Sequence, residues 1–191
     1  MLDSVLDPDL SDAVRPTAPV VDGVVESPLG RRIGEHLVQV HDMFRRELDQ
    51  VRAVLDQLRA GHLSLGAARG ELQQVALLAN NWTFGGLCQQ FCLGLTQHHE
   101  LESGQIFPHL RDVEPELTPV LDQLHREHRI IHDVIRSVDA ALVQLASTPV
   151  DLAAVDAAVD TLAETLLSHF AYEERELVAP LARHGFYPGQ L

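Results

Sequence analysis

Four long stretches of the chain repeat apolar residues at alternating steps of three and four, and one histidine interrupts each stretch. In the clearest of them, residues 116–146, the repeat runs from Leu117 to Leu145 and is broken only at His128. This spacing is the period of an α-helix that buries one face. The sequence therefore predicts four amphipathic helices, at about residues 30–59, 67–103, 116–146 and 150–184.

Four helices of this length joined by short connections favour an all-α fold, an antiparallel up-down four-helix bundle. Pro108 and Pro115 are expected to mark the second connection, and Pro180 to end or kink the last helix. The first 28 residues hold four prolines without a helical period, which indicates an extended N-terminal arm, either mobile or laid across the bundle. The expected organisation is an arm over residues 1–28, a bundle over 29–184 and an irregular tail over 185–191.

Two of the four stretches place a glutamate one helical turn after the histidine. Residues four apart lie on the same face of a helix, so each glutamate is expected to point into the core with its histidine. A buried charge without a partner costs several kcal/mol or loses its charge. The six polar side chains expected to share the core are His41, His98, Glu102, His128, His169 and Glu173.

A single histidine on an apolar face is more often a hydrogen-bonded core residue than a metal ligand. Six such groups together would cost more than the net stability of a typical domain, about 5–15 kcal/mol, unless a cation compensates them. The set is too large for a closed structural zinc site. It suits two ions that are each held by two histidines and bridged by the carboxylates and solvent, with Fe, Mn or Zn as the metal.

The spacing of these residues resembles the hemerythrin-like family, also called HHE cation-binding domains, over roughly residues 30–183. The resemblance is carried by the segments Val40-His41-Asp42, His98-His99-x-x-Glu102 with Phe107-Pro108, Glu127-His128, and His169-x-x-Tyr172-Glu173-Glu174. It implies a non-haem centre of two Fe ions inside a four-helix bundle, bridged by carboxylates and an oxo or hydroxo group, with Mn or Zn possible instead. Carried over residue by residue, the four histidines become terminal ligands, and the two glutamates become bridging ligands.

Three further residues near these positions are open to two interpretations. Oxygen-carrying hemerythrins use His-x-x-x-His on the third helix and His-x-x-x-x-Asp on the fourth; here His132 follows His128, and Glu174 follows His169 by five. His132 is either a fifth histidine ligand or a side chain behind the ligands or at the surface. By helical rotation of about 140° from His169, Glu174 is expected in solvent. Tyr172 is expected to pack with its hydroxyl bonded nearby, and a phenolate on iron is the alternative.

The remaining histidines are expected at the surface or behind the ligands. They are His36, His62, His99, His109, His125 and His184.

The composition excludes several classes of partner. The net charge is −14 and every one of the 14 basic residues is arginine, so the chain is expected to repel nucleic acid. No run of 18 apolar residues is present, so no membrane span is expected. Cys88 and Cys92 lie one turn apart, which is awkward for a disulfide, and the acidic N-terminus does not resemble a secretory signal. A cytoplasmic protein with reduced thiols is expected, and the oligomeric state is left open.

The resemblance implies a protein that binds or senses O2, peroxide or NO, or that handles iron under oxidative or nitrosative stress. The ligand is then a small diatomic molecule or a peroxide. Two alternatives stay open, a di-iron redox enzyme of peroxidase or oxidase type and a metal store whose ions mainly support the fold.

Overall fold

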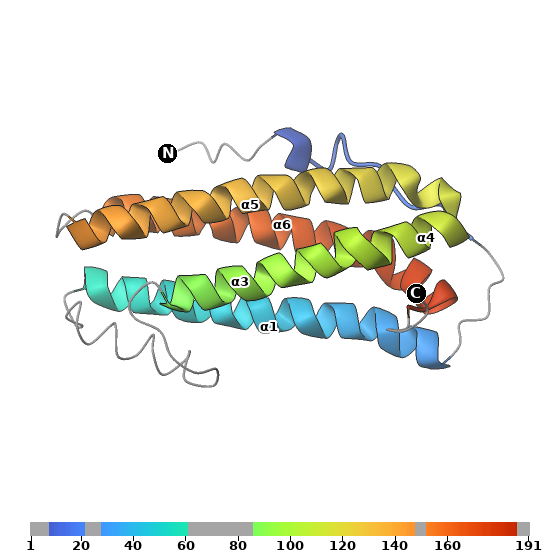
Figure 1. The fold of residues 1–191 in the computed structure, drawn as a ribbon, viewed down its shortest axis with the longest axis horizontal. Coiled ribbons are helices and arrows are strands. Elements are labelled where there is room, and N and C mark those ends of the chain that lie inside the picture. Colours follow the sequence, from blue (N-terminus) through green and yellow to red (C-terminus); the bar gives the residue numbers. More distant parts are fainter. Residues whose placement is uncertain (1–7, 22–27, 61–85, 148–151, 187–191) are drawn as a thin grey trace.

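The protein is a bundle of four long helices, described here in a computed structural model over residues 8–21, 28–60, 86–147 and 152–186 (Figure 1). The bundle is formed by α1 (Pro28–Arg59), α3 (Gly86–Leu101), α5 (Thr118–Ser147) and α6 (Leu152–His184). Successive helices run in opposite directions, and the described ranges contain no strand. The predicted all-α up-down bundle is confirmed.

The second long helix extends beyond its expected end. A π-helical turn, η3 (Glu102–Ile106), follows α3 directly, and α4 (Phe107–Val113) continues the helix past Pro108. The prediction that Pro108 marks the connection is wrong: the hydrogen-bond pattern changes at the π-helical turn, and Pro108 lies in the first turn of the α-helix that follows it, where proline is tolerated. The connection lies instead around η4 (Pro115–Leu117). The part of this helix expected between residues 67 and 85 lies outside the described residues.

The last helix also passes through its proline. Pro180 lies inside α6, which continues to His184 and ends at Gly185. Gly185 has a φ of 69° and donates its N–H to the Leu181 carbonyl at 2.8 Å, an arrangement that glycine adopts without strain.

Helices α1 and α6 approach closely where α1 carries a glycine. A Cβ atom on Gly34 would lie 2.8 Å from the backbone oxygen of Val178. Any larger residue at this position would push the two helices apart and disturb the face of α1 that carries His41.

The core consists of two apolar clusters with a polar layer between them. Phe44, Leu95 and Leu166 belong to the first cluster. Leu37 and Leu121 belong to the second. Along each long helix, the histidines of the repeat lie where one cluster gives way to the other, so the surrounding side chains exclude water from them.

The N-terminal arm lies against α5 and α6 (Figure 1). It begins with a short 3-10 turn, η1 (Pro8–Leu10), and Leu10 is buried. The Tyr172 hydroxyl donates to the Pro16 carbonyl at 2.8 Å, and the Ala18 N–H donates to a Glu176 carboxylate oxygen at 2.6 Å. Over residues 8–21, the arm is thus laid across the bundle. None of the described helices is long and apolar enough to cross a membrane.

Candidate metal centre

The structure brings the six predicted side chains together in the polar layer, in two adjoining groups. The first, here called the two-histidine group, consists of His41, His98, Glu102 and Glu173. The second, the three-histidine group, consists of His99, His128 and His169. Within each group the potential ligand atoms all lie within 4.8 Å of one another. Each of the four long helices contributes, because each carries its histidine at the same level of the bundle.

The two carboxylates of the two-histidine group also face the three-histidine group. Glu102 places one oxygen 3.1 Å from Nε2 of His98 and the other 3.6 Å from Nε2 of His128. Glu173 places one oxygen 3.5 Å from Nε2 of His41 and 3.3 Å from Nε2 of His169. Each carboxylate therefore faces one histidine of either group, which is the arrangement a bridging ligand requires.

Many of the potential ligand atoms in the two groups are buried and have no hydrogen-bond partner. Both oxygens of Glu102 and of Glu173 are buried without one, as are Nε2 of His128 and His169 and both ring nitrogens of His99. Leaving a buried acceptor unsatisfied costs about 1–3 kcal/mol, and more for a charged group. So many convergent orphan atoms are the expected state of a ligand set without its cation, so the residues fit a pair of metal ions.

Burial keeps three of the histidines neutral. It lowers the pKa of His98 to about 3 and lowers the pKa values of His99 and His128 well below their usual range, with neighbouring imidazoles contributing. Burial also raises the pKa of Glu102 well above its usual range, and the charge of Glu173 adds to the effect. A metal ion binds neutral imidazole, so the layer presents these three histidines in the form that ligation needs.

His169 and Glu173 instead form an ion pair. Burial opposes the charge on His169, but the hydrogen bond to Glu127 and the negative charges of Glu173 and Glu127 outweigh it and raise the pKa of His169 to about 9. Burial likewise opposes the charge on Glu173, and its contact with His169 lowers the pKa of Glu173 to about 2. A cation entering here would take over the role of the proton on His169.

Two histidines of the centre are oriented by a glutamate behind them. Nδ1 of His41 donates to Glu174 at 2.9 Å, and Nδ1 of His169 donates to Glu127 at 3.0 Å. Each carboxylate accepts a hydrogen bond from Nδ1–H, which fixes a proton there and turns Nε2 towards the two groups. Nδ1 of His128 similarly lies 2.9 Å from the Ser103 hydroxyl.

Glu174 thus lies behind His41 and is only partly exposed, so it is less solvated than expected. Its carboxylate accepts from His41 and from Arg45, at 2.9 and 2.8 Å. The rotation angle gave the direction of Glu174 correctly as away from the ligand face, but α1 covers that direction. Glu173 points inward as expected.

Tyr172 and His132 both lie outside the two groups. The Tyr172 hydroxyl is bonded to the Pro16 carbonyl, so the packing interpretation fits, and the phenolate alternative has no support in the geometry. His132 is half-buried, with its ring centroid 5.9 Å from that of His99, which places it behind that histidine.

His99 is the residue that sequence reasoning missed. It was expected at the surface or behind the ligands, yet it is 1% exposed and stacks on His128 with ring centroids 4.1 Å apart. Helix α3 packs between α1 and α5, so adjacent residues both point inward: His98 meets His41 at 3.1 Å, and His99 meets His128. The doublet His98-His99 was the available signal.

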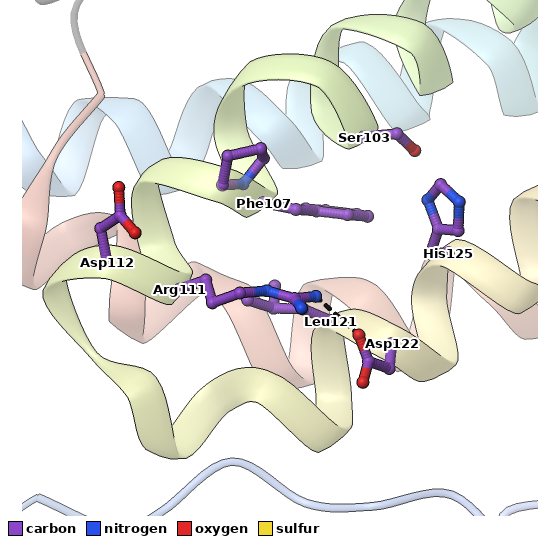
Figure 2. Close-up of a pocket in the computed structure, with 8 residues that line it drawn as sticks. Ser103, Phe107, Arg111, Asp112, Leu121, Asp122 and His125 are labelled. Carbon is purple, nitrogen blue, oxygen red and sulfur yellow. Dashed lines mark hydrogen bonds and ion pairs between the residues drawn. The ribbon is translucent and has the colours of Figure 1, made fainter.

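A surface groove lies beside the three-histidine group, between α4 and α5 (Figure 2). Its volume is about 490 Å³ and its lining includes Ser103, Phe107 and His125. Ser103 is bonded to His128, and the Phe107 ring stacks on His128 with centroids 5.4 Å apart. The groove therefore comes within one side chain of the candidate centre.

The remaining cysteines and histidines named in the sequence analysis lie outside the two groups or outside the described residues. Cys92 is half-buried against the first apolar cluster, and the Cys88 side chain lies outside the described residues. His36 and His125 are exposed, His109 binds the Gly185 carbonyl and His184 binds Glu114, while His62 lies outside the described residues.

The fold and the site together define a helical-bundle protein with a buried cluster of histidines and carboxylates suited to metal ions. The family model described as the hemerythrin HHE cation binding domain matches residues 32–181. The chain therefore belongs to the hemerythrin HHE cation-binding family, as the resemblance predicted. No curated protein and no solved structure matches it significantly.

Proposed function

We propose that this protein holds two iron ions in the candidate centre and uses them to bind O2, peroxide or NO, or to handle iron under oxidative or nitrosative stress. The observation that supports it is the position of Glu102 and Glu173, each facing a histidine of both groups without a hydrogen-bond partner. Imidazole and carboxylate donors suit iron, and also Mn or Zn. Iron bound here would supply one-electron chemistry and a vacant position for a small ligand.

The two positions would be unequal. Each carboxylate faces a histidine of both groups and would bridge the two ions, whereas one group offers two imidazoles and the other three. An ion in the two-histidine group would have one protein ligand fewer, so we expect the exogenous ligand to bind on that side. The apolar clusters above and below exclude bulky substrates, which favours a diatomic molecule or a peroxide.

Metal analysis of the purified full chain, combined with its visible spectrum under argon, O2 and NO, tests this function. We expect about two irons per chain and a spectral change that is reversible on removal of the gas. The His132→Ala chain is the matched control, since His132 lies outside both groups. A wild-type chain that takes up no metal under anaerobic iron loading would overturn the proposal.

A redox enzyme is the second candidate, favoured by the groove beside His128. A reductant bound there would lie close to the centre without entering the core. Sustained turnover of peroxide with a reductant supports the enzyme, whereas a single reversible spectral change supports a carrier or sensor. Two bound ions with neither response would indicate a metal store or a structural site.

A further inference from the structure

The N-terminal arm contributes a buried charge to the bundle. Arg15 forms a two-pronged ion pair with Glu127, Nε to Oε1 at 2.8 Å and Nη2 to Oε2 at 2.9 Å. Its Nη1 also donates to the Ser168 hydroxyl at 3.0 Å, and the guanidinium lies 4.6 Å from the centroid of the Tyr172 ring. The Arg15 side chain is 3% exposed and that of Glu127 is 0% exposed. Such a planar, doubly bonded pair fixes orientation in a way that a surface ion pair does not.

Glu127 connects this arginine to the candidate centre. The carboxylate oxygen that accepts from Nη2 of Arg15 also accepts from Nδ1 of His169, at 3.0 Å. The other oxygen accepts from Gln123 at 2.9 Å as well as from Arg15. With four donors on two oxygens, the carboxylate has no remaining freedom to rotate. Arg15 thus helps to position the Glu127 carboxylate, and this carboxylate in turn fixes a proton on Nδ1 of His169.

The rest of the arm follows the same face of α6. Ser168, Tyr172 and Glu176 are spaced by four residues, and they bind Arg15, the Pro16 carbonyl and the Ala18 N–H in order. This row runs directly beside His169 and Glu173, which α6 presents to the centre. Docking of the arm and ordering of the ligands therefore involve the same turns of α6.

We propose that the N-terminal arm is a latch on the metal centre: Arg15 acts through Glu127 as a positioning residue for His169, so that arm docking and metal retention in the three-histidine group strengthen each other. The proposal rests on the proposed function, because it needs a bound metal. Coupling of two binding events is reciprocal, so the metal must also tighten the arm. A purely structural ion pair would support the fold without that reciprocity.

Three variants separate the two roles. Arg15→Ala removes the ion pair, and Arg15→Lys keeps a charge but loses the planar fork. Tyr172→Phe is the matched control, because it removes the bond from the hydroxyl to Pro16 and leaves the Arg15–Glu127 pair in place. Each full-length chain is loaded with Fe²⁺ without oxygen, and circular dichroism checks its helix content.

The first measurement is the half-time for removal of each iron by a chelator. Disturbing the outer partner of a metal-bound histidine typically costs 10–100-fold in affinity, so Arg15→Ala should release one of the two irons about 10–100-fold faster. Arg15→Lys should lie in between, and Tyr172→Phe, which removes one bond to the arm but keeps the Arg15–Glu127 pair, should release iron only slightly faster than wild type.

The second measurement is hydrogen exchange at the Ala18 amide, which reports arm docking through its bond to Glu176. Iron should slow this exchange in the wild type and have little effect on it in Arg15→Ala.

A folded Arg15→Ala chain that keeps both irons as long as wild type, and an Ala18 amide indifferent to iron in the wild type, would each overturn the latch while leaving iron binding intact. If Arg15→Ala does not fold, the same comparison between Arg15→Lys and Tyr172→Phe decides. A wild-type chain that binds no iron overturns both the latch and the proposed function.

Discussion

Two histidines of the candidate centre each contact a glutamate that is in turn paired with an arginine. The two His–Glu–Arg series differ in how deeply they are buried. His41 donates to Glu174, which binds Arg45, whereas His169 donates to Glu127, which binds Arg15. The side chains of Glu174 and Arg45 are 21% and 26% exposed. Those of Glu127 and Arg15 are 0% and 3% exposed. The same types of residue are used twice, but only the Glu174–Arg45 pair is exposed to water.

The origin of the arginines explains the difference. Arg45 lies one turn after His41 on the same helix, so it stays at the bundle surface. Arg15 comes from the arm, 112 residues before its glutamate, and the arm itself covers the pair. Exposed ion pairs contribute about 0–1 kcal/mol, whereas removal of one partner from a buried pair costs about 3–5 kcal/mol. The centre therefore has one support that solvent screens and one that depends on tertiary docking.

The largest expected effect separates the two ligand groups. His99→Ala should empty the three-histidine position and leave about one metal per chain, because it removes one of the three imidazoles that this group offers to an ion. His132→Ala, one turn from His128 and outside the groups, should keep two. Metal analysis after gel filtration makes the measurement. Two metals in His99→Ala would remove His99 from the ligand set.

The metal-free protein should lose stability on both sides of about pH 6.5. His98, His99 and His128 have folded pKa values below the unfolded value, so their contribution is intact above about 6.5 and is lost as the pH falls below it; for His98 the loss continues to about pH 3. The loss is at most about 1.4 kcal/mol per pH unit for each group. His169 behaves oppositely: its raised pKa stabilises the fold below about 6.5, and this is lost as the pH rises through about 9.

Urea unfolding of the metal-free chain between pH 4 and 9.5 measures both the loss of stability at acid pH (the acid limb) and the loss at alkaline pH (the alkaline limb). The raised pKa of Glu102 adds to the alkaline loss, so the part due to His169 is isolated by a matched pair. Glu127→Gln should flatten the alkaline limb, and Glu174→Gln should leave it unchanged. Equal limbs in the two variants would contradict the assignment to His169.

The two glutamates should also differ in metal retention. Glu127→Ala should shorten chelator-resistant retention of one metal by about 10–100-fold, since a buried support of a ligand histidine is lost. Glu174→Ala should cost less, about threefold, because water can replace a partly exposed carboxylate behind His41. Stopped-flow chelation of the two variants makes the comparison. The reverse ranking would show that exposure does not set the importance of each support.

The smallest effect is expected for Arg45→Ala. Its ion pair with Glu174 is partly exposed, so its loss should change the unfolding free energy by under about 1 kcal/mol. Raising the salt concentration should weaken the wild type towards the variant, because mobile ions screen this pair. Thermal unfolding at low and high salt checks this. A larger loss of stability that does not depend on salt would show that the Arg45 pair behaves like the buried Arg15 pair.

Much of the centre could be read from the chain. The helical period fixes which residues share a face, so the inward positions of His41, His98, His128 and His169 and of Glu102 and Glu173 followed from spacing alone. The period does not say what lies opposite a face. Glu174 was correctly placed off the ligand face, yet α1 meets it there and Arg45 binds it.

The sequence by itself determined the bundle, its apolar stripes and the level at which six polar groups meet. Only the tertiary structure decided that His99 is buried, because α3 has a neighbour on two sides, and that the arm closes over Glu127. Periodicity is a property of a single helix, so it can be recognised from the spacing of residues that are close together in the sequence. The burial of a residue at the edge of a stripe, and a contact across 112 residues, depend on how separate segments pack.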